Sequence, residues 1–233
     1  MDYTNRPPDD TVRRDAVGAA MHKLDLESLK RDGLLWQGRA QQSSAERTMP
    51  TGWAVLDEVL GGGWPRASLA EILSEAHQGL PLLIPLLARL STEQRWLALI
   101  APPYVPYAPA LVARGVAVER LLLIRDVSTM QCLWAIEQAL KSGACAAVLA
   151  WPGELQTAQL RRLQLAAEQG GCLGVLFRIP RTARQGSPAA LRLRVRPAPL
   201  GLEVDVLKRR AGWGGARCIV PFDSERDVTD RAR

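Results

Sequence analysis

The sequence has few aromatic and metal-binding residues. Only 5% of its 233 residues are aromatic, and there are two phenylalanines and two histidines. Four cysteines are present, none in a C-x-x-C pair and none near a histidine. Zinc sites are built from closely spaced cysteines and histidines, so we expect no metal site. The apolar neighbours of Cys145 and Cys172 predict buried, reduced thiols.

Long hydrophobic runs are also absent from the sequence. The longest apolar stretch, residues 79–88, is about half the length that a membrane-spanning helix needs. The first residues, MDYTNRPPDDTVRRDAV, lack the apolar core of a signal peptide. The sequence therefore predicts a cytoplasmic protein without membrane contact.

The chain does contain ample apolar residues and an excess of positive charge. Hydrophobic residues make up 47%, which is enough for one domain of ordinary size. The net charge is +6 at pH 7. A basic balance suits an acidic partner, such as nucleic acid or an acidic protein surface, without identifying one.

Composition divides the chain into three parts. Within residues 1–47 we expect a helix over 11–35 followed by a polar linker. Apolar residues recur at helical spacing among charges in the helical part. Such an arm could dock on a partner or pack on its own domain, and the pattern leaves both open. Residues 48–223 form the predicted core. Residues 224–233 are a charged tail that we expect to be disordered.

Within the core, apolar runs of strand length alternate with helical patterns. This alternation predicts an α/β fold, with a mostly parallel sheet covered by helices on both faces. Ser128 is placed to cap one helix, and Gly170–Gly171 to end another. The expected strands are 69–73, 96–101, 121–124, 144–151 and 173–179, and the expected helices are 80–90, 107–114, 128–142 and 157–169.

The pattern changes after Pro180. The segment PRTARQGSP reads as a polar loop, and residues 191–195 and 202–207 then alternate strictly between apolar and polar. Alternation indicates strands with one solvated face, so we expect an antiparallel extension of the sheet that residues 216–222 complete.

The segment 50–73, PTGWAVLDEVLGGGWPRASLAEIL, resembles the entry into the RecA recombinase core. In that family a phosphate-binding loop, G-x-x-x-x-G-K-[ST], comes next. Here Gly79 keeps the second glycine, whereas Ser74 replaces the first. Leu80 stands at the lysine position and Pro81 at the hydroxyl position. The resemblance therefore implies a degenerate loop that has lost its phosphate-binding groups.

Two further losses follow from the same resemblance. The water-activating glutamate of the family falls near Pro103, and the metal-orienting aspartate falls at Trp151. With the cation, the acid and the metal ligand all missing, we expect no enzymatic activity, no bound cofactor and no metal.

Several stretches, in order along residues 48–223, resemble the ImuA family of translesion-synthesis accessory proteins. These stretches are the degenerate loop, APPYVPYAPAL, AWPGEL and LKRRAGWGG. That family is RecA-like and related to the cell-division inhibitor SulA. The resemblance implies a non-catalytic role in SOS-induced mutagenic bypass of DNA damage. Its implied partners are an ImuB-like inactive Y-family polymerase homologue, RecA and, indirectly, an error-prone polymerase subunit.

Two alternatives to that role remain open. One is a SulA-like division inhibitor, which blocks a cytoskeletal polymer. The other is a RecA-like ATPase with an atypical phosphate loop.

Cations concentrate in the C-terminal third. A row of arginines on one predicted strand face suits DNA phosphates, single-stranded DNA included, or an acidic partner. The same row could be a solvated face that Glu203 and Asp205 neutralise across strands. The loop 180–188 could contact DNA or merely connect two elements. The candidates for DNA or partner binding are Arg181, Arg184, Arg192, Arg194, Arg196, Lys208, Arg209, Arg210 and Trp213.

Three aromatic residues are further candidates for contact. Trp151 ends a predicted strand, where open α/β sheets place ligands. It could fill an empty nucleotide site, form a contact patch or pack against the degenerate loop. Tyr104 and Tyr107, on a proline-rich loop, would suit a protein interface if they are exposed.

Overall fold

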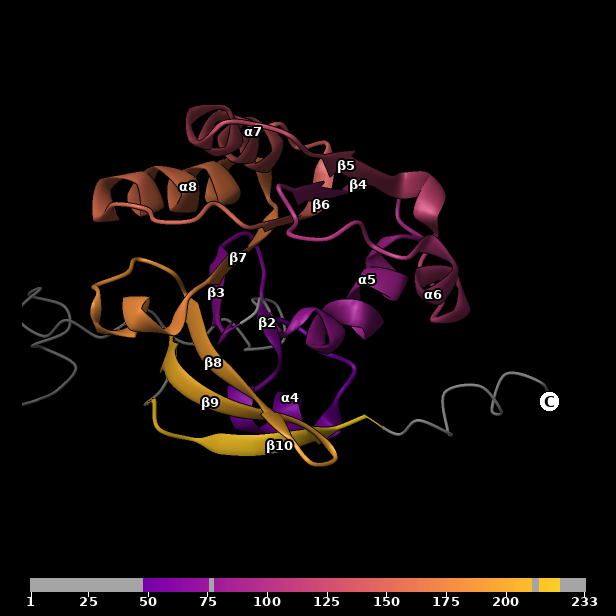
Figure 1. Ribbon diagram of the computed structural model, residues 1–233, viewed down its shortest axis with the longest axis vertical. Coiled ribbons are helices and arrows are strands. Elements are labelled where there is room, and N and C mark those ends of the chain that lie inside the picture. The colour runs from indigo at the N-terminus through magenta and orange to yellow at the C-terminus, as the bar shows by residue number, and fades with distance from the viewer. Residues whose placement is uncertain (1–47, 76–77, 211–213, 223–233) are drawn as a thin grey trace, which may run out of the picture. The chain divides into compact units, whose positions relative to one another are not determined.

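The computed structural model describes residues 48–75, 78–210 and 214–222 (Figure 1). The predicted N-terminal helix and linker (1–47), the tail (224–233) and Trp213 lie outside the described residues. The first described elements are the strands β1 (Thr48–Met49) and β2 (Trp64–Pro65), which pair antiparallel, and the helix α4 (Ala54–Leu60) between them.

One eight-stranded sheet organises the rest, with strand order β10-β9-β8-β3-β7-β6-β4-β5. The pairs from β8 to β5 are all parallel, whereas β9 runs antiparallel to both β8 and β10. The predicted mostly parallel sheet with antiparallel C-terminal strands is thus confirmed. The strands are β3 (Leu69–Leu73), β4 (Trp96–Ile100), β5 (Leu121–Ile124), β6 (Cys145–Ala150), β7 (Leu173–Arg178), β8 (Leu191–Ala198), β9 (Gly201–Arg209) and β10 (Arg217–Pro221).

The predicted helices also form, with small changes at their ends. Residues 80–90 divide into a 3-10 helix and an α-helix, and a proline lies in the first turn of each. The loop after β7 contains a short 3-10 helix that the sequence did not indicate. The helical elements are η2 (Leu80–Leu83), α5 (Ile84–Leu90), α6 (Ala108–Ala113), η3 (Val118–Arg120), α7 (Thr129–Lys141), α8 (Thr157–Gly170) and η4 (Pro180–Arg184).

Local sequence sets the ends of α7 and α8. The Ser128 hydroxyl accepts a hydrogen bond from the Gln131 amide (3.4 Å), and the Gln131 side chain accepts one from the Ser128 amide (2.9 Å). This capping box satisfies two amides at the start of α7. Gly171, at φ 58°, takes the left-handed conformation that ends α8. Both signals were predicted from the sequence.

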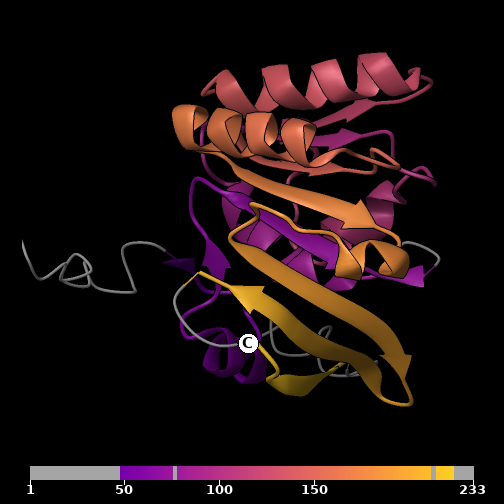
Figure 2. The same ribbon diagram turned by 90° about the vertical axis from the view of Figure 1, so that its left-hand side faces the viewer.

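Two apolar cores form between the sheet and its helices. One contains Leu86 and Leu87 of α5 with Phe177 of β7. The other contains Ile136 of α7 and Leu163 of α8. The helices α7 and α8 lie side by side on one face of the sheet (Figure 2). The sheet is therefore covered on both faces, as its apolar strands predict.

All four cysteines are free and buried, and burial raises the pKa of each thiol. The pKa of Cys172 rises to about 12. Its proton is held more tightly in the folded chain than in the unfolded one. The resulting stability is fully present below about pH 9 and is lost as the pH rises from 9 towards 12.

We therefore expect the wild-type chain to lose roughly 2–3 kcal/mol more stability than Cys172→Ala between pH 9 and pH 11. Urea unfolding of both chains at each pH measures this difference. Equal losses in the two chains would show that Cys172 does not titrate differently on folding.

Candidate functional site

The degenerate phosphate loop follows β3 and closes on itself. The Ser74 amide donates to the carbonyl of Arg178 (3.0 Å), and its hydroxyl donates to the carbonyl of Gln78 (2.5 Å). Gly79 is buried at φ 118°, and a Cβ there would lie 2.8 Å from Cγ2 of Ile72. Only glycine fits this position, so the surviving glycine has a packing role in this chain.

The chemistry around this loop does not suit a triphosphate. In its described part, residues 74–75 and 78–81, the one charged side chain is that of Glu75, which is exposed. Leu80 is half-buried, and Pro81 has no amide hydrogen to offer an anion. These residues supply neither the cation nor the metal ligand that holds phosphates in P-loop proteins.

Trp151 lies beside the loop and is packed. Its ring stacks on that of Phe177, with centroids 4.4 Å apart and planes 5° apart. Its amide donates to the carbonyl of Ile100 (3.1 Å), and its side chain packs on the core that contains Phe177. The Cβ position of Gly79 lies 3.7 Å from the Phe177 ring. The two stacked rings thus occupy space next to the degenerate loop.

We expect ATP·Mg²⁺ to bind no more tightly than about millimolar, because nothing in the described loop compensates phosphate charge. Calorimetric titration into the purified full chain measures this, with a RecA-type ATPase as positive control. Micromolar affinity would contradict the interpretation of a lost site.

The arginine row of β8, Arg192, Arg194 and Arg196, is buried or half-buried. This corrects the interpretation of the row as an exposed basic face for DNA or an acidic partner. Arg192 is buried and ion-pairs with Glu71, and its guanidinium also donates to three carbonyls of residues 182–185. Arg178 pairs with the other oxygen of Glu71 at 2.8 Å. Arg192 therefore fixes η4 to the sheet. This buried triad was not predicted from the sequence, although Glu71 within the otherwise apolar strand LAEIL is a signal for it.

The remaining cations of β8 to β10 are mostly neutralised or used locally. Arg196 pairs with Glu203 and Asp205, both at 2.9 Å, as the neutralised-face alternative proposed. Arg194 is half-buried. The ammonium of Lys208 donates to the carbonyl of Ser187 (2.7 Å), and burial, with help from Arg192, lowers the pKa of Lys208.

The other candidates are dispersed over the fold. Arg209 donates to the carbonyl of Val59 (3.2 Å), Arg210 pairs with Glu168 (3.2 Å), and Arg181 pairs with Glu154. Among the candidate arginines that the structure describes, only Arg184 is both exposed and without a hydrogen bond or ion pair. The structure does not bring the candidates together into one basic site.

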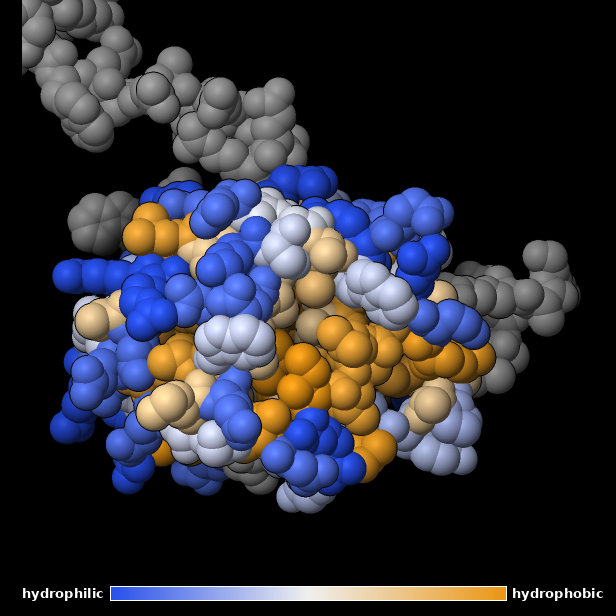
Figure 3. All heavy atoms as spheres, turned by 90° about the horizontal axis from the view of Figure 1, so that it is seen from above, coloured by the Kyte–Doolittle hydropathy of each residue, from blue (hydrophilic) through white to orange (hydrophobic). Residues whose placement is uncertain are grey.

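Exposed apolar side chains, by contrast, recur along β5 and in the segments next to it. This strand is the last in the sheet order, and its Leu122 and Leu123 are 44% and 36% exposed. On α7, which follows it, Met130 is 83% and Trp134 63% exposed. Seen from above, an apolar area extends across this side of the molecule (Figure 3).

The loop after β4 adds to the same end of the sheet, because β4 and β5 are parallel neighbours. Pro103, Tyr104, Val105 and Tyr107 are all exposed. The sequence left the exposure of Tyr104 and Tyr107 open, and the structure shows them 74% and 72% exposed. We call Tyr104, Val105, Leu122, Leu123, Met130 and Trp134 the edge surface.

Two negative findings apply to the part of the chain that the structure describes. No helix there is long and apolar enough to cross a membrane. No group of three or more His, Cys, Asp or Glu side chains there could hold a metal ion.

Solved structures show two likenesses. The RadB recombinase aligns over 73% of this chain and 94% of its own, at 14% identity and a TM-score of 0.59. This likeness shows a RecA-like fold. SulA from Pseudomonas aeruginosa aligns over 48% of this chain and 97% of its own, at 33% identity and a TM-score of 0.41.

Sequence comparison identifies the family. The family described as cell division inhibitor SulA matches residues 69–174. SulA of Edwardsiella piscicida is 36% identical over 96 residues, which are 41% of this chain and 57% of that protein. SulA of Yersinia pestis (strain Pestoides F) is 31% identical over 114 residues, 49% of this chain and 68% of that one. The chain thus spans little more than half the length of the first relative and two thirds of the second. Because the second relative is matched over two thirds of its length at 31% identity, the chain belongs to the SulA family.

Proposed function

We propose that this protein inhibits cell division without catalysis, by binding a protein of the division machinery through the edge surface. Its relatives are described as cell division inhibitors, which supports a role in cell division. The position of the edge surface supports the mode of action. All six of its residues lie within the matched segment 69–174, whereas the exposed Val55, Leu200 and Ile219 lie outside it.

The edge surface has the composition of a protein-binding site. Removing exposed apolar surface from water contributes about 25 cal/mol of favourable free energy for each Å² that a partner covers. Aromatic and methionine side chains are enriched at the centres of interfaces, and Trp134 and Met130 lie one helical turn apart on α7. Strand β5 also carries backbone groups at the end of the sheet, where another chain can contact them. Contact with a protein explains these features together.

The degenerate loop supports a non-catalytic mechanism. By the RecA resemblance, the lysine position holds Leu80 and the hydroxyl position holds Pro81. The position of the metal-orienting aspartate holds Trp151. An inhibitor of this kind acts by occupancy, so its effect depends on the ratio of the two proteins. It needs neither ATP nor a metal.

Polymer assembly tests this proposal. The purified full chain is added in rising amounts to a tubulin-like division protein that assembles with GTP, and the polymer is sedimented. We expect the pelleted fraction to fall in proportion to the added chain, with no change on adding ATP. An unchanged pellet at excess chain would reject the proposal.

The second candidate is an accessory role in mutagenic translesion synthesis. Helix α4 and the strands β8, β9 and β10 lie outside the segment that matches the SulA family, so the chain has parts to which that match assigns no role. The order of motifs resembles the ImuA family, a resemblance that implies an ImuB-like polymerase homologue and RecA as partners. The exposed Arg184 and Arg181 suit contact with a phosphate backbone.

Co-purification separates the two candidates. The full chain is incubated with an ImuB-like homologue, with RecA and with single-stranded DNA, each at two salt concentrations. The second candidate would be favoured if the ImuB-like protein is retained at both salt concentrations and the chain leaves assembly of the division protein unchanged.

A further inference from the structure

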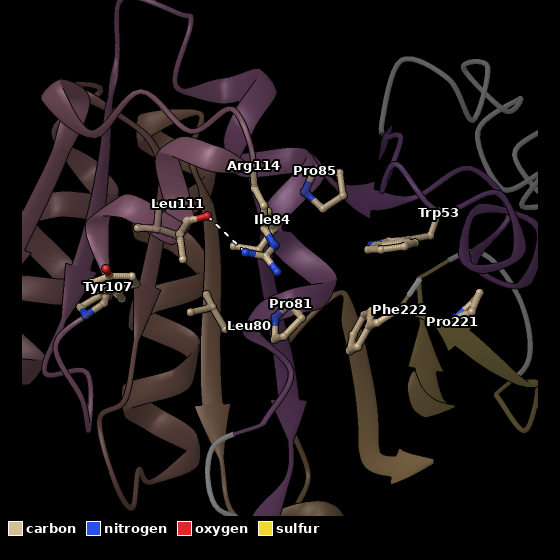
Figure 4. Close-up of a pocket in the computed structure, with 12 residues that line it drawn as sticks. Trp53, Leu80, Pro81, Ile84, Pro85, Tyr107, Leu111, Arg114, Pro221 and Phe222 are labelled. Carbon is tan, nitrogen blue, oxygen red and sulfur yellow. Dashed lines mark hydrogen bonds between the residues drawn. The ribbon is translucent and has the colours of Figure 1, made fainter. Parts of the chain in front are cut away.

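An apolar groove of about 580 Å³ opens beside the degenerate loop (Figure 4). Its volume falls within the usual range of ligand pockets, about 300–1,000 Å³. Leu80 and Pro81, which stand at the lysine and hydroxyl positions of the phosphate loop, line it together with Ile84 and Pro85 of α5. The segment that would have held phosphate thus forms an apolar wall.

The opposite walls come from distant parts of the chain. Tyr107, Leu111 and Arg114 approach from α6 and its flanks, and Trp53 and Phe222 from the other side (Figure 4). None of these residues belongs to the edge surface, so the groove is a separate feature.

The walls are fixed before any ligand binds. The Trp53 indole donates to the carbonyl of Leu82 (3.1 Å), and its ring lies 5.7 Å from that of Phe222. Gly52, at φ 89°, brings the backbone so close to Pro85 that a Cβ would lie 2.4 Å from its ring. A groove held open in this way loses little conformational entropy on binding.

Polar groups are scarce in the groove. The indole N–H of Trp53 is already used, and the lining prolines have no amide hydrogen. Among the described residues that line the groove, Arg114 is the one with a charged side chain. Its guanidinium donates to the carbonyl of Ala110 (3.3 Å) and forms no ion pair with any residue that the structure describes. The described walls of the groove therefore offer mainly apolar contact and the positive charge of Arg114.

We propose that this groove binds an amphipathic helix of a partner protein, with apolar side chains in the groove and an acidic side chain against Arg114. An extended peptide would leave backbone groups unpaired against these walls, whereas a helix satisfies its own. Charge complementarity requires an acid at the Arg114 end.

The test uses a designed helical peptide as the probe, with leucines at i, i+3, i+4 and i+7 and a glutamate at the end of that face. Fluorescence anisotropy with the full chain measures its affinity. We expect roughly micromolar binding to the wild type and a loss of about tenfold in Arg114→Glu. A peptide with lysine in place of the glutamate should prefer Arg114→Glu to the wild type. Arg184→Glu, an exposed charge change in η4, is the matched control and should bind the first peptide as the wild type does.

Two further results decide the proposal. Ala110→Trp fills the groove without removing its charge and should abolish binding, while its thermal unfolding stays as in the wild type. No binding of the peptide, or equal binding by Ala110→Trp, would overturn the proposal. Binding of sodium oleate but not of the peptide would also overturn it, because the groove would then take acyl chains.

Discussion

Replacing Glu71 with alanine is expected to destabilise the chain by about 3–5 kcal/mol. The Glu71 and Arg178 side chains are fully buried, and that of Arg192 is 8% exposed. Removal of the carboxylate leaves two guanidinium groups in the core without compensating charge. The loss should appear as a large shift in the urea midpoint of unfolding.

Glu203→Ala provides the matched control for this prediction. Glu203 also pairs with two arginines, Arg196 and Arg217, but these are 42% and 60% exposed. Solvent screens such pairs, so the control should lose no more than about 1 kcal/mol. Equal losses in Glu71→Ala and Glu203→Ala would show that the buried triad is not a special source of stability.

Replacing Trp134 with alanine is expected to weaken binding to the division protein by about thirtyfold or more, which corresponds to at least about 2 kcal/mol. Trp134 is 63% exposed, so its removal should leave stability almost unchanged. Biolayer interferometry with the immobilised division protein measures the affinity, and thermal unfolding checks the fold.

Leu165→Ala is the control for this second prediction. Leu165 is 65% exposed on α8 and does not belong to the edge surface. It should bind as the wild type does. If both variants bound equally well, the edge surface would not be the interface.

The sequence predicted the regular elements of the core well because their signals are local. Strands buried on both faces are continuous apolar runs, and the Ser128 and Gly171 caps depend on neighbours within a few residues. The order of the strands is not local. Leu121–Ile124 has the same composition whether it lies inside a sheet or at its end, so the exposure of Leu122 and Leu123 could not be predicted.

The same distinction explains the arginine row. Alternation placed Arg192 and Arg194 on one strand face, but their environment depends on β3, which is more than a hundred residues earlier in the chain. The parallel pairing of β3 with β8 sets Glu71 beside Arg192 and turns a predicted surface cation into a buried one. Charge alone could not distinguish the two environments.

The lost phosphate-binding groups could be identified residue by residue, since Leu80 and Pro81 can be read directly against the motif. The groove that they line could not, because Trp53, Arg114 and Phe222 complete it from separate segments. The resemblance to the RecA fold and to the SulA family is confirmed by the comparisons. The resemblance to the ImuA family stays a prediction.

Cell length after controlled expression tests most directly whether the protein inhibits division by contact. Wild type and Trp134→Ala are expressed at equal levels in a rod-shaped bacterium whose division protein binds the wild type in vitro. We expect long filaments with the wild type and cells of normal length with Trp134→Ala. Normal cells with the wild type, or filaments of equal length with both chains, would contradict inhibition through the edge surface.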